Sequence, residues 1–196
     1  MDFIFLIGPS AVGKTTLARA LYQHYKGVYI EQNLVPEFVN PEDVPDIGDY
    51  EETLCWENVL CQLDFFRSRG RQNIVALDFD DRRARELPRL FCGTRFIILR
   101  LFSSDPQQIL AQMIHRRDHE GGLFAPDGVE HSNAVISRRP LLPNECKLDI
   151  AGKTPEEVLS EAIHIIDSFT PALEYDYHMP GEEHYLSWVQ SRQKTQ

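Results

Sequence analysis

The stretch Gly8-Pro9-Ser10-Ala11-Val12-Gly13-Lys14-Thr15 decides the fold, because it matches the pattern G-x-x-x-x-G-K-[ST] at every fixed position. A short apolar segment, Phe3–Ile7, precedes it, and a helical pattern over Thr15–Tyr25 follows it. Between a strand and a helix, a glycine-rich loop can turn successive backbone N–H groups inward, at the positive end of the helix dipole. The sequence therefore predicts a phosphate-binding loop near the amino terminus.

Two side chains of this loop carry its chemistry. The Lys14 ammonium can reach the β- and γ-phosphates of a nucleotide, and the Thr15 hydroxyl can bind Mg²⁺. The alternative is a chance match on a surface loop, and the flanking strand and helix argue against it.

The composition is that of a globular chain with one domain. It has 196 residues, of which 42% are apolar, and this is enough for a single α/β core. The formal net charge is −10. This acidity argues against non-specific binding of nucleic acid, which needs clustered Lys and Arg, and indicates solubility instead.

The cysteines and the amino terminus bear on the compartment. Cys55, Cys61, Cys92 and Cys146 form no C-x-x-C pair, so we expect reduced thiols in a cytoplasmic protein. We see no basic leader and no apolar run of about 18 residues. The sequence therefore predicts neither a signal peptide nor a membrane span.

Apolar segments alternate with helical patterns along most of the chain. The expected strands are Phe3–Ile7, Gly27–Glu31, Asn73–Asp78, Arg95–Leu101 and Cys146–Ile150. The expected helices are Thr15–Tyr25, Asp49–Arg69, Asp81–Phe91, Asp105–Asp118 and a last one that begins at Thr154 with a capping box to Glu157. Most strands are continuous apolar runs, as in a parallel sheet covered on both sides. The sequence predicts an α/β fold of three layers, α/β/α, with a five-stranded parallel sheet and helices on both faces.

Three segments interrupt this alternation: residues 32–48, rich in Pro and acidic residues; residues 120–130, with Gly121-Gly122; and the polar, aromatic tail 170–196. Long irregular insertions in a compact domain are usually functional. We expect a catalytic domain over 1–169, with a lid at about 116–139 and an acceptor-binding region at about 32–69, followed by a carboxyl-terminal extension over 170–196 with one short helix at Glu182–Arg192.

An acidic residue and two arginine pairs are candidates for chemistry on a bound triphosphate. Asp78 ends the third strand, where it could hold the Mg²⁺ shell or take a proton from an attacking hydroxyl. Asp80 and Asp81 follow at once, so which carboxylate acts is open, and one of them could simply cap the next helix. The pairs Arg116-Arg117 and Arg138-Arg139 end the helices on either side of the flap, where they could close onto phosphates or only favour the helix dipoles.

The acceptor pocket is expected between segment 32–48 and the helix 49–69. Its candidate residues are two acidic, two aromatic, one amide and one basic side chain: Glu31, Glu37, Phe38, Trp56, Gln62 and Arg82. Aromatic residues at helical spacing also suit a core, and Arg82 also suits a solvated helix face. His115 and His119 share an i, i+4 spacing and are interpreted as surface residues.

Taken together, these motifs resemble the P-loop small-molecule kinases, a group that includes nucleotide, deoxynucleoside, shikimate and gluconate kinases. The resemblance covers about residues 1–168 and includes the Asp-Pro helix ending at Arg116-Arg117, the flap, Ser137-Arg138-Arg139, and Asp149-Ile150 before the last helix. Asp78-Phe79-Asp80-Asp81-Arg82 departs from the D-G-F-P-R of adenylate kinases and from the [ED]-R-S of deoxynucleoside kinases. The acceptor therefore stays open.

The resemblance implies ATP and Mg²⁺ as cofactors, with the adenine near the lid and Ile150–Lys153. The nucleotide-binding residues are then expected to be Gly8, Ser10, Ala11, Val12, Gly13, Lys14, Thr15, Thr16 and Arg116. Thr15 and Asp78 are the expected metal ligands, and Lys14, Asp78, Arg117 and Arg138 are the expected catalytic residues.

The leading hypothesis is ATP-dependent transfer of the γ-phosphoryl group to a small-molecule acceptor: a nucleoside, a nucleotide or a small hydroxylated metabolite. Lys14 and a lid arginine would offset the developing charge, and Asp78 would orient or deprotonate the acceptor. We expect a monomer or homodimer that binds neither nucleic acid nor membranes. The alternative is a nucleotide-binding ATPase switch that acts through the tail, residues 170–196.

Overall fold

The central layer of the protein is a sheet of five parallel strands. The computed structural model describes residues 1–32, 47–77, 81–120 and 128–180, with side chains except those of 47–55, 81, 82 and 120. The strands are β1 (Phe3–Ile7), β2 (Val28–Glu31), β3 (Asn73–Ala76), β4 (Phe96–Phe102) and β5 (Glu145–Asp149). Their spatial order is β2-β3-β1-β4-β5, so β1 is central and β2 and β5 are the edges.

The strand pattern predicted from the sequence is confirmed, with ends that move by two residues at most. Strand β1 is buried along its whole length, because β3 and β4 pair with it on both sides and helices cover both of its faces. Phe3 is in register with Asn73 of β3 and with Phe96 of β4. A strand with no solvent-facing side needs a continuous apolar sequence, which is what this segment has.

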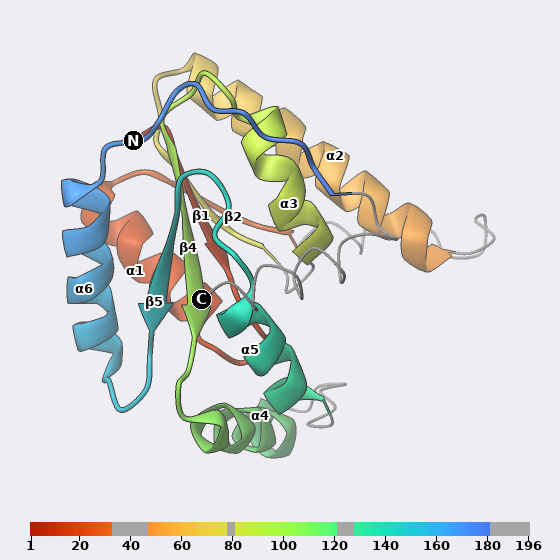
Figure 1. Ribbon diagram of the computed structural model, residues 1–196, viewed down its shortest axis with the longest axis vertical. Helices are drawn as coiled ribbons and strands as arrows, with labels where there is room; N and C mark the ends of the chain where they lie inside the picture. Colours follow the sequence, from red (N-terminus) through yellow and green to blue (C-terminus); the bar gives the residue numbers. More distant parts are fainter. Residues whose placement is uncertain (33–46, 78–80, 121–127, 181–196) are drawn as a thin grey trace.

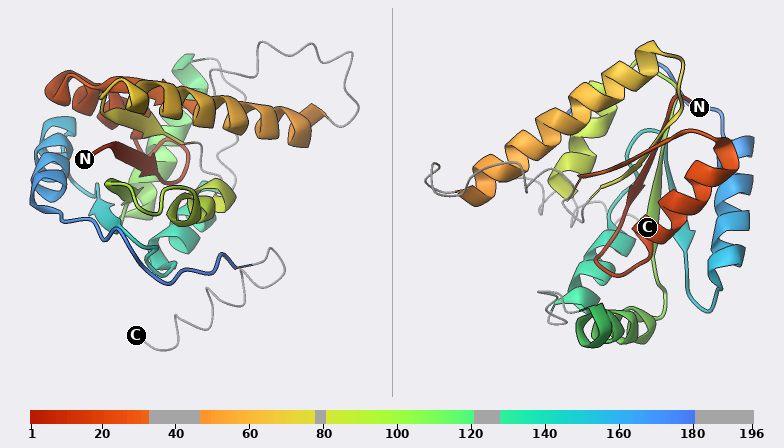
Figure 2. Two further views of the ribbon diagram at one scale, coloured as in Figure 1. Left: turned by 90° about the horizontal axis from the view of Figure 1, so that it is seen from above. Right: turned by 180° about the vertical axis from the view of Figure 1, so that it is seen from behind.

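Helices cover both faces of the sheet. Helices α1 (Lys14–Tyr25) and α6 (Pro155–Ser168) lie on one face, and α2 (Ile47–Ser68) and α3 (Asp81–Leu90) lie on the other (Figures 1 and 2). Helices α4 (Pro106–Glu120) and α5 (Val129–Arg138) lie beyond the carboxyl ends of β4 and β5 (Figure 1). The predicted capping box of α6 forms, with Thr154 N–H donating to Glu157 at 2.8 Å. The three-layer α/β/α architecture is therefore confirmed.

The strands build a separate apolar core on each side, because alternate side chains point to opposite faces. Ile4 and Leu6 pack in the cluster with α1 and α6, whereas Phe3, Phe5 and Ile7 pack with α2 and α3. The same alternation decides which face a polar residue on these strands can reach.

Residues 170–180, called the strap below, run back along α3 after α6 ends (Figure 1). The Tyr175 hydroxyl donates to the Pro88 carbonyl at 2.6 Å, and the Tyr177 hydroxyl donates to the Arg85 carbonyl at 2.9 Å. Pro88 lies inside α3 and has no N–H to give the helix. The strap is thus attached to α3 through two side-chain hydrogen bonds to its backbone carbonyls. The short helix expected at 182–192 lies outside the described residues.

Candidate nucleotide-binding site

The loop between β1 and α1 has the backbone geometry that its two glycines predict. Gly8 has φ +149°, and a Cβ built on it would come within 2.5 Å of the Leu101 carbonyl oxygen, so only glycine fits. Gly13 has φ +93° and forms the N-cap of α1 in the left-handed region. No described side chain caps this helix, so its first N–H groups are open toward an anion.

Lys14 folds back over the loop. Its Nζ donates to the Gly8 carbonyl at 2.9 Å and to the Pro9 carbonyl at 3.0 Å. These contacts hold the ammonium above the loop, where a phosphate cradled by the N–H groups would meet it. Lys14 is thus positioned by the motif's own backbone.

Thr15, Tyr29 and Glu31 form a second feature, called the pocket network below. The Thr15 hydroxyl donates to Oε1 of Glu31 at 2.7 Å, and the Tyr29 hydroxyl donates to Oε2 of the same carboxylate. Glu31 is the last residue of β2, and Tyr29 precedes it by two, so both point toward α1. Burial raises the pKa of Tyr29 to about 12, with the Glu31 carboxylate adding to the effect, so the hydroxyl keeps its proton and donates.

The pocket network suits a magnesium ion. Thr15 and Glu31 offer hydroxyl and carboxylate oxygens, which are the hard ligands that Mg²⁺ prefers. Among the described residues no group of three or more His, Cys, Asp or Glu could hold a metal by itself. A metal here would therefore take its remaining ligands from nucleotide phosphates and water, as is usual for Mg²⁺ in phosphoryl-transfer sites.

The loop and two members of the pocket network, Thr15 and Glu31, border one cleft of about 970 Å³. Its far wall is one face of α4, which presents Gln108, Ala111, Gln112, His115 and Arg116. These positions follow the i, i+3, i+4, i+7, i+8 spacing of a single helix face. The turn after β5 closes the cleft with Ile150 and Lys153. The cleft thus has a polar helical wall, a cationic floor at Lys14 and room for a nucleotide.

The turn after β5 is held in place by a carboxylate. Asp149 accepts hydrogen bonds from the backbone N–H groups of Ser104 at 2.9 Å and Ala151 at 3.0 Å. Burial alone would raise the pKa of Asp149, but hydrogen bonding from the Ser104 side chain, these two N–H groups and the nearby Lys153 charge favour the ionised form and leave the pKa below its ordinary value. Asp149 thereby ties the cleft wall at Ile150 to the start of α4.

Most residues expected to bind the nucleotide do lie together. The cleft is lined by Ala11, Val12, Gly13, Lys14, Thr15, Thr16 and Arg116 from that set, and also by Glu31. Gly8 and Ser10 belong to the same loop. Glu31 was expected to bind the acceptor, and the structure places it beside the Thr15 hydroxyl.

The other predicted arginines lie apart from the cleft as the structure describes it. Arg117 is exposed and pairs with Asp118 at 2.9 Å, and Arg138 is exposed on α5. The pairing of Arg139 with Arg138 as lid charges is corrected by the structure, because Arg139 is only 1% exposed and donates to Glu145 at 2.6 Å. Arg138 is the last residue of α5, whereas Arg139 follows it with ψ 137°, outside the helical region, so the two adjacent arginines need not point the same way.

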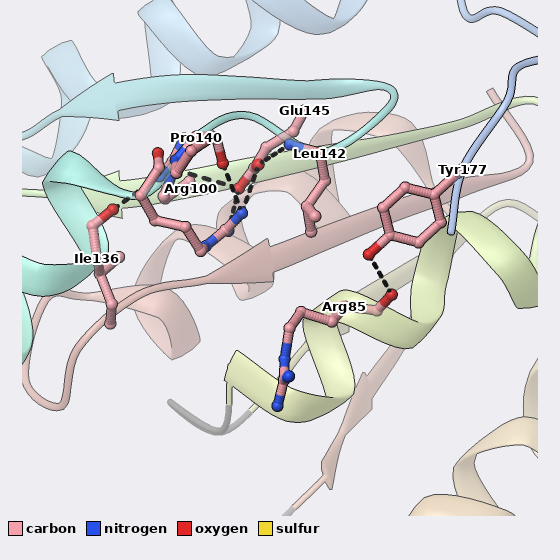
Figure 3. A network of polar contacts seen from close by, with 8 residues as sticks. Arg85, Arg100, Ile136, Pro140, Leu142, Glu145 and Tyr177 are labelled. Carbon is pink, nitrogen blue, oxygen red and sulfur yellow. Dashed lines mark hydrogen bonds and ion pairs between the residues drawn. The ribbon is translucent and has the colours of Figure 1, made fainter. Parts of the chain in front are cut away.

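Arg139 belongs to a buried ion network with Arg100 and Glu145 (Figure 3). Arg100 on β4 lies 3.2 Å from Glu145 on β5 and also donates to the Ile136 carbonyl at 2.7 Å. The Leu142 N–H donates to the second Glu145 oxygen at 2.6 Å. The network joins α5 to the β4–β5 edge of the sheet, and it is structural.

Of the other residues expected at the acceptor pocket, some lie on α2 and the rest lie outside the described residues. Trp56 is 3% exposed, in the core between α2 and α3, and its indole N–H donates to Glu86 at 2.9 Å. Gln62 lies on α2, where its amide donates to Asn58. Asp78, Glu37, Phe38 and the side chain of Arg82 lie outside the described residues, as do 121–127 of the lid.

Sequence reasoning missed Tyr29 and the polar face of α4. His115 is exposed, as interpreted from the sequence, and it also lines the cleft together with Gln108 and Gln112. The signal was present: these positions share one side of the helix, whereas Ile109 and Met113 on another side enter the core. Tyr29 gave no comparable signal, because an aromatic residue on an edge strand is ordinary.

Proteins of known structure share this fold. No family model and no curated protein sequence matches the chain. A sugar kinase from a Janibacter species superposes with a TM-score of 0.60 at 20% identity, over 85% of this chain and 95% of that one. A gluconokinase from Sinorhizobium meliloti gives 0.58 at 17% identity, over 85% and 91%. A shikimate kinase from Acinetobacter baumannii gives 0.53 at 14% identity, over 86% and 94%.

At such identities the likeness establishes the fold. Among the described residues no helix is long and apolar enough to span a bilayer. The phosphate-binding loop, the sheet order and these neighbours agree: the chain has the fold of the P-loop small-molecule kinases, as its sequence predicts.

Proposed function

We propose that the protein is a kinase that transfers the γ-phosphoryl group of ATP, with Mg²⁺, to a small-molecule acceptor. The observation that carries the proposal is the joint placement of Lys14 and the Thr15–Glu31 pair in the lining of one cleft. A phosphate cradle, a cation and a metal-binding oxygen pair are what phosphoryl transfer requires, because catalysis there is mostly positioning and charge stabilisation.

The described residues divide the work between them. The N–H groups at the start of α1 would bind the phosphates, and Lys14 would exchange its loop carbonyls for phosphate oxygens. Thr15 and Glu31 would hold Mg²⁺, which neutralises charge on the β- and γ-phosphates when bound. Arg116 and the α4 face would border the base and ribose.

The acceptor is proposed to be small and to enter from the side of residues 32–69. The three similar solved structures described above are named as kinases of gluconate, of a sugar and of shikimate. We propose a nucleoside, a nucleotide or a hydroxylated metabolite, with Asp78 as the group that orients or deprotonates it. We also propose that Arg117 and Arg138 contribute positive charge near the phosphoryl group during its transfer.

The test is Lys14→Ala, assayed by ADP release against a panel of nucleosides, nucleotides, sugars and shikimate-like acids. We expect loss of transfer by roughly 10²–10³-fold, the usual effect of removing one charge-stabilising donor. The matched control is Lys147→Ala, which removes an exposed lysine of β5 that does not line the cleft.

The proposal fails if Lys14→Ala turns over as fast as the wild type. Slow hydrolysis by the wild type that no acceptor stimulates would point to the alternative, a nucleotide-dependent switch. Unfolding by urea should give similar midpoints for both variants, because the Lys14 ammonium is part-buried and donates to loop carbonyls, not to the apolar core.

A further inference from the structure

The Glu31 carboxylate is held from both sides. Thr15 donates to one oxygen at 2.7 Å, and Tyr29 donates to the other. Thr15 belongs to α1, whereas Tyr29 belongs to the same strand as Glu31, two residues earlier. The strand's alternation makes this geometry possible, since residues two apart point to the same face.

Tyr29 is itself fixed by α1. The Arg19 guanidinium lies 5.8 Å from the centre of the Tyr29 ring, and the Tyr22 ring lies 6.4 Å from it at 48°. Arg19 and Tyr22 are three residues apart on α1, so they share one helix face. A cation over an aromatic face and a tilted ring pair both restrict the ring. The Tyr29 hydroxyl therefore approaches Glu31 from a set direction.

The direction of the Thr15 proton follows from this arrangement. A hydroxyl has one proton and two acceptor lone pairs. An ionised carboxylate only accepts, so the Thr15 proton points to Glu31 and the lone pairs face elsewhere. A metal ion binds through those lone pairs. A glutamate that turned away would let the Thr15 hydroxyl rotate and would lose its own place beside the metal.

We infer that Tyr29 is a positioning residue: its hydroxyl holds Glu31 against Thr15, so that both oxygens are aligned for Mg²⁺ before the metal–nucleotide complex arrives. The inference rests on the proposed function for the identity of the ligand. It goes beyond it in assigning a role to a residue that touches neither the metal nor the nucleotide. The gain is a smaller entropy cost of metal binding. A free glutamate side chain loses rotamer freedom on binding, whereas one held by hydrogen bonds has already lost it.

The experiment is titration calorimetry of ADP with Tyr29→Phe, in Mg²⁺ and in EDTA. Removing only the hydroxyl should leave the affinity for ADP in EDTA unchanged, since the loop binds phosphate without Glu31. In Mg²⁺ we expect affinity about tenfold weaker than that of the wild type, the usual worth of one hydrogen bond to a charged group. In the transfer assay the half-saturating Mg²⁺ should rise by a similar factor, with kcat recovered at saturating metal.

The matched control is Tyr25→Phe. The Tyr25 hydroxyl also donates to a carboxylate, that of Asp167 at 2.8 Å, but this contact joins α1 to α6 and does not line the cleft. Its response to Mg²⁺ should equal that of the wild type.

The outcomes separate the two proposals. If the wild type binds ADP more tightly in Mg²⁺ and Tyr29→Phe behaves in the same way, the positioning role is wrong and the kinase proposal stands. Equal losses in Tyr29→Phe and Tyr25→Phe would also overturn the role, because they would mean general loosening of α1. If the wild type itself shows no effect of Mg²⁺ and no transfer, the proposed function falls and takes this inference with it.

Discussion

The two edge strands of the sheet, β2 and β5, each carry a glutamate that bonds to several neighbours, and the two glutamates differ in burial and in the charge of their partners. Glu31 ends β2, points toward α1 and borders a cleft of about 970 Å³. Glu145 begins β5, and its side chain is 0% exposed between Arg100 and Arg139. The partners of Glu31 are neutral hydroxyls, whereas those of Glu145 are cations. Because its partners are neutral, the negative charge of Glu31 can still attract a cation. The negative charge of Glu145 is already neutralised by its cationic partners.

The charge of its partners distinguishes a functional glutamate from a structural one better than the residue type does. A buried ion pair is weak evidence for stability as such, but breaking one is costly because the remaining charge stays buried. An open carboxylate with uncharged partners has the opposite signature, with little effect on folding and a large effect on ligand binding. The following predictions place each site on one side of that division.

The largest effect is expected for Glu145→Ala. The substitution leaves the guanidiniums of Arg100 and Arg139, at most 1% exposed, without their carboxylate partner. We expect the free energy of unfolding to fall by about 3–5 kcal/mol, measured by urea denaturation. A loss below about 1 kcal/mol, the size typical of an exposed pair, would mean that the network is not the structural anchor described above. Arg138→Ala, an exposed neighbour, is the control and should stay close to the wild type.

The next largest effect is expected for Glu31→Gln, and it should fall on activity. The amide has nearly the shape of the carboxylate but lacks its charge, so it can accept from Thr15 and cannot neutralise a metal ion. We expect phosphoryl transfer to fall by roughly 10²-fold, with a change in the free energy of unfolding within about 1 kcal/mol. If the variant were instead mainly unstable and its residual folded fraction fully active, the contrast with Glu145 would collapse.

Much of the fold was predictable because its signals are local. The apolar run of β1, the glycines at 8 and 13 and the capping box at Thr154 each fix a conformation over a few residues. These signals repeat along the chain, and together they indicate the parallel sheet and its helical layers. The order of the strands, β2-β3-β1-β4-β5, was not predicted and comes from the structure.

The site was less predictable because its contacts are distant in sequence. Glu31 and Thr15 are hydrogen-bonded although they lie 16 residues apart in the sequence, and Arg100 and the Arg139 carbonyl are hydrogen-bonded at a separation of 39 residues. Pro140 ends the helix before Arg139. That Arg139 is buried, however, depends on Glu145, which lies on a strand. Trp56 likewise has the spacing of a core residue and of a ligand contact, and only the packing of α2 on α3 places it in the core. Adjacent like residues are therefore where sequence reasoning is weakest.

The smallest effect is expected for Tyr177→Phe. This substitution removes an uncharged hydrogen-bond donor on the same side of the sheet as Glu145. The Tyr177 hydroxyl donates to the Arg85 carbonyl at 2.9 Å, in the turn of α3 that Pro88 interrupts (Figure 3). Because no charge is left behind, the free energy of unfolding should fall by only about 1 kcal/mol, the net worth of one neutral hydrogen bond.

Amide hydrogen exchange should locate that loss in α3 and the strap, with α1 unchanged, since the Tyr177 hydroxyl donates to a backbone carbonyl of α3. Tyr22→Phe, at an exposed site on α1, is the control and should alter neither the urea midpoint nor the exchange of α3. A loss as large as that of Glu145→Ala would show that enclosure, and not charge, sets the cost at this face of the sheet. The rule drawn from the two edge strands would then need to be stated in terms of burial alone.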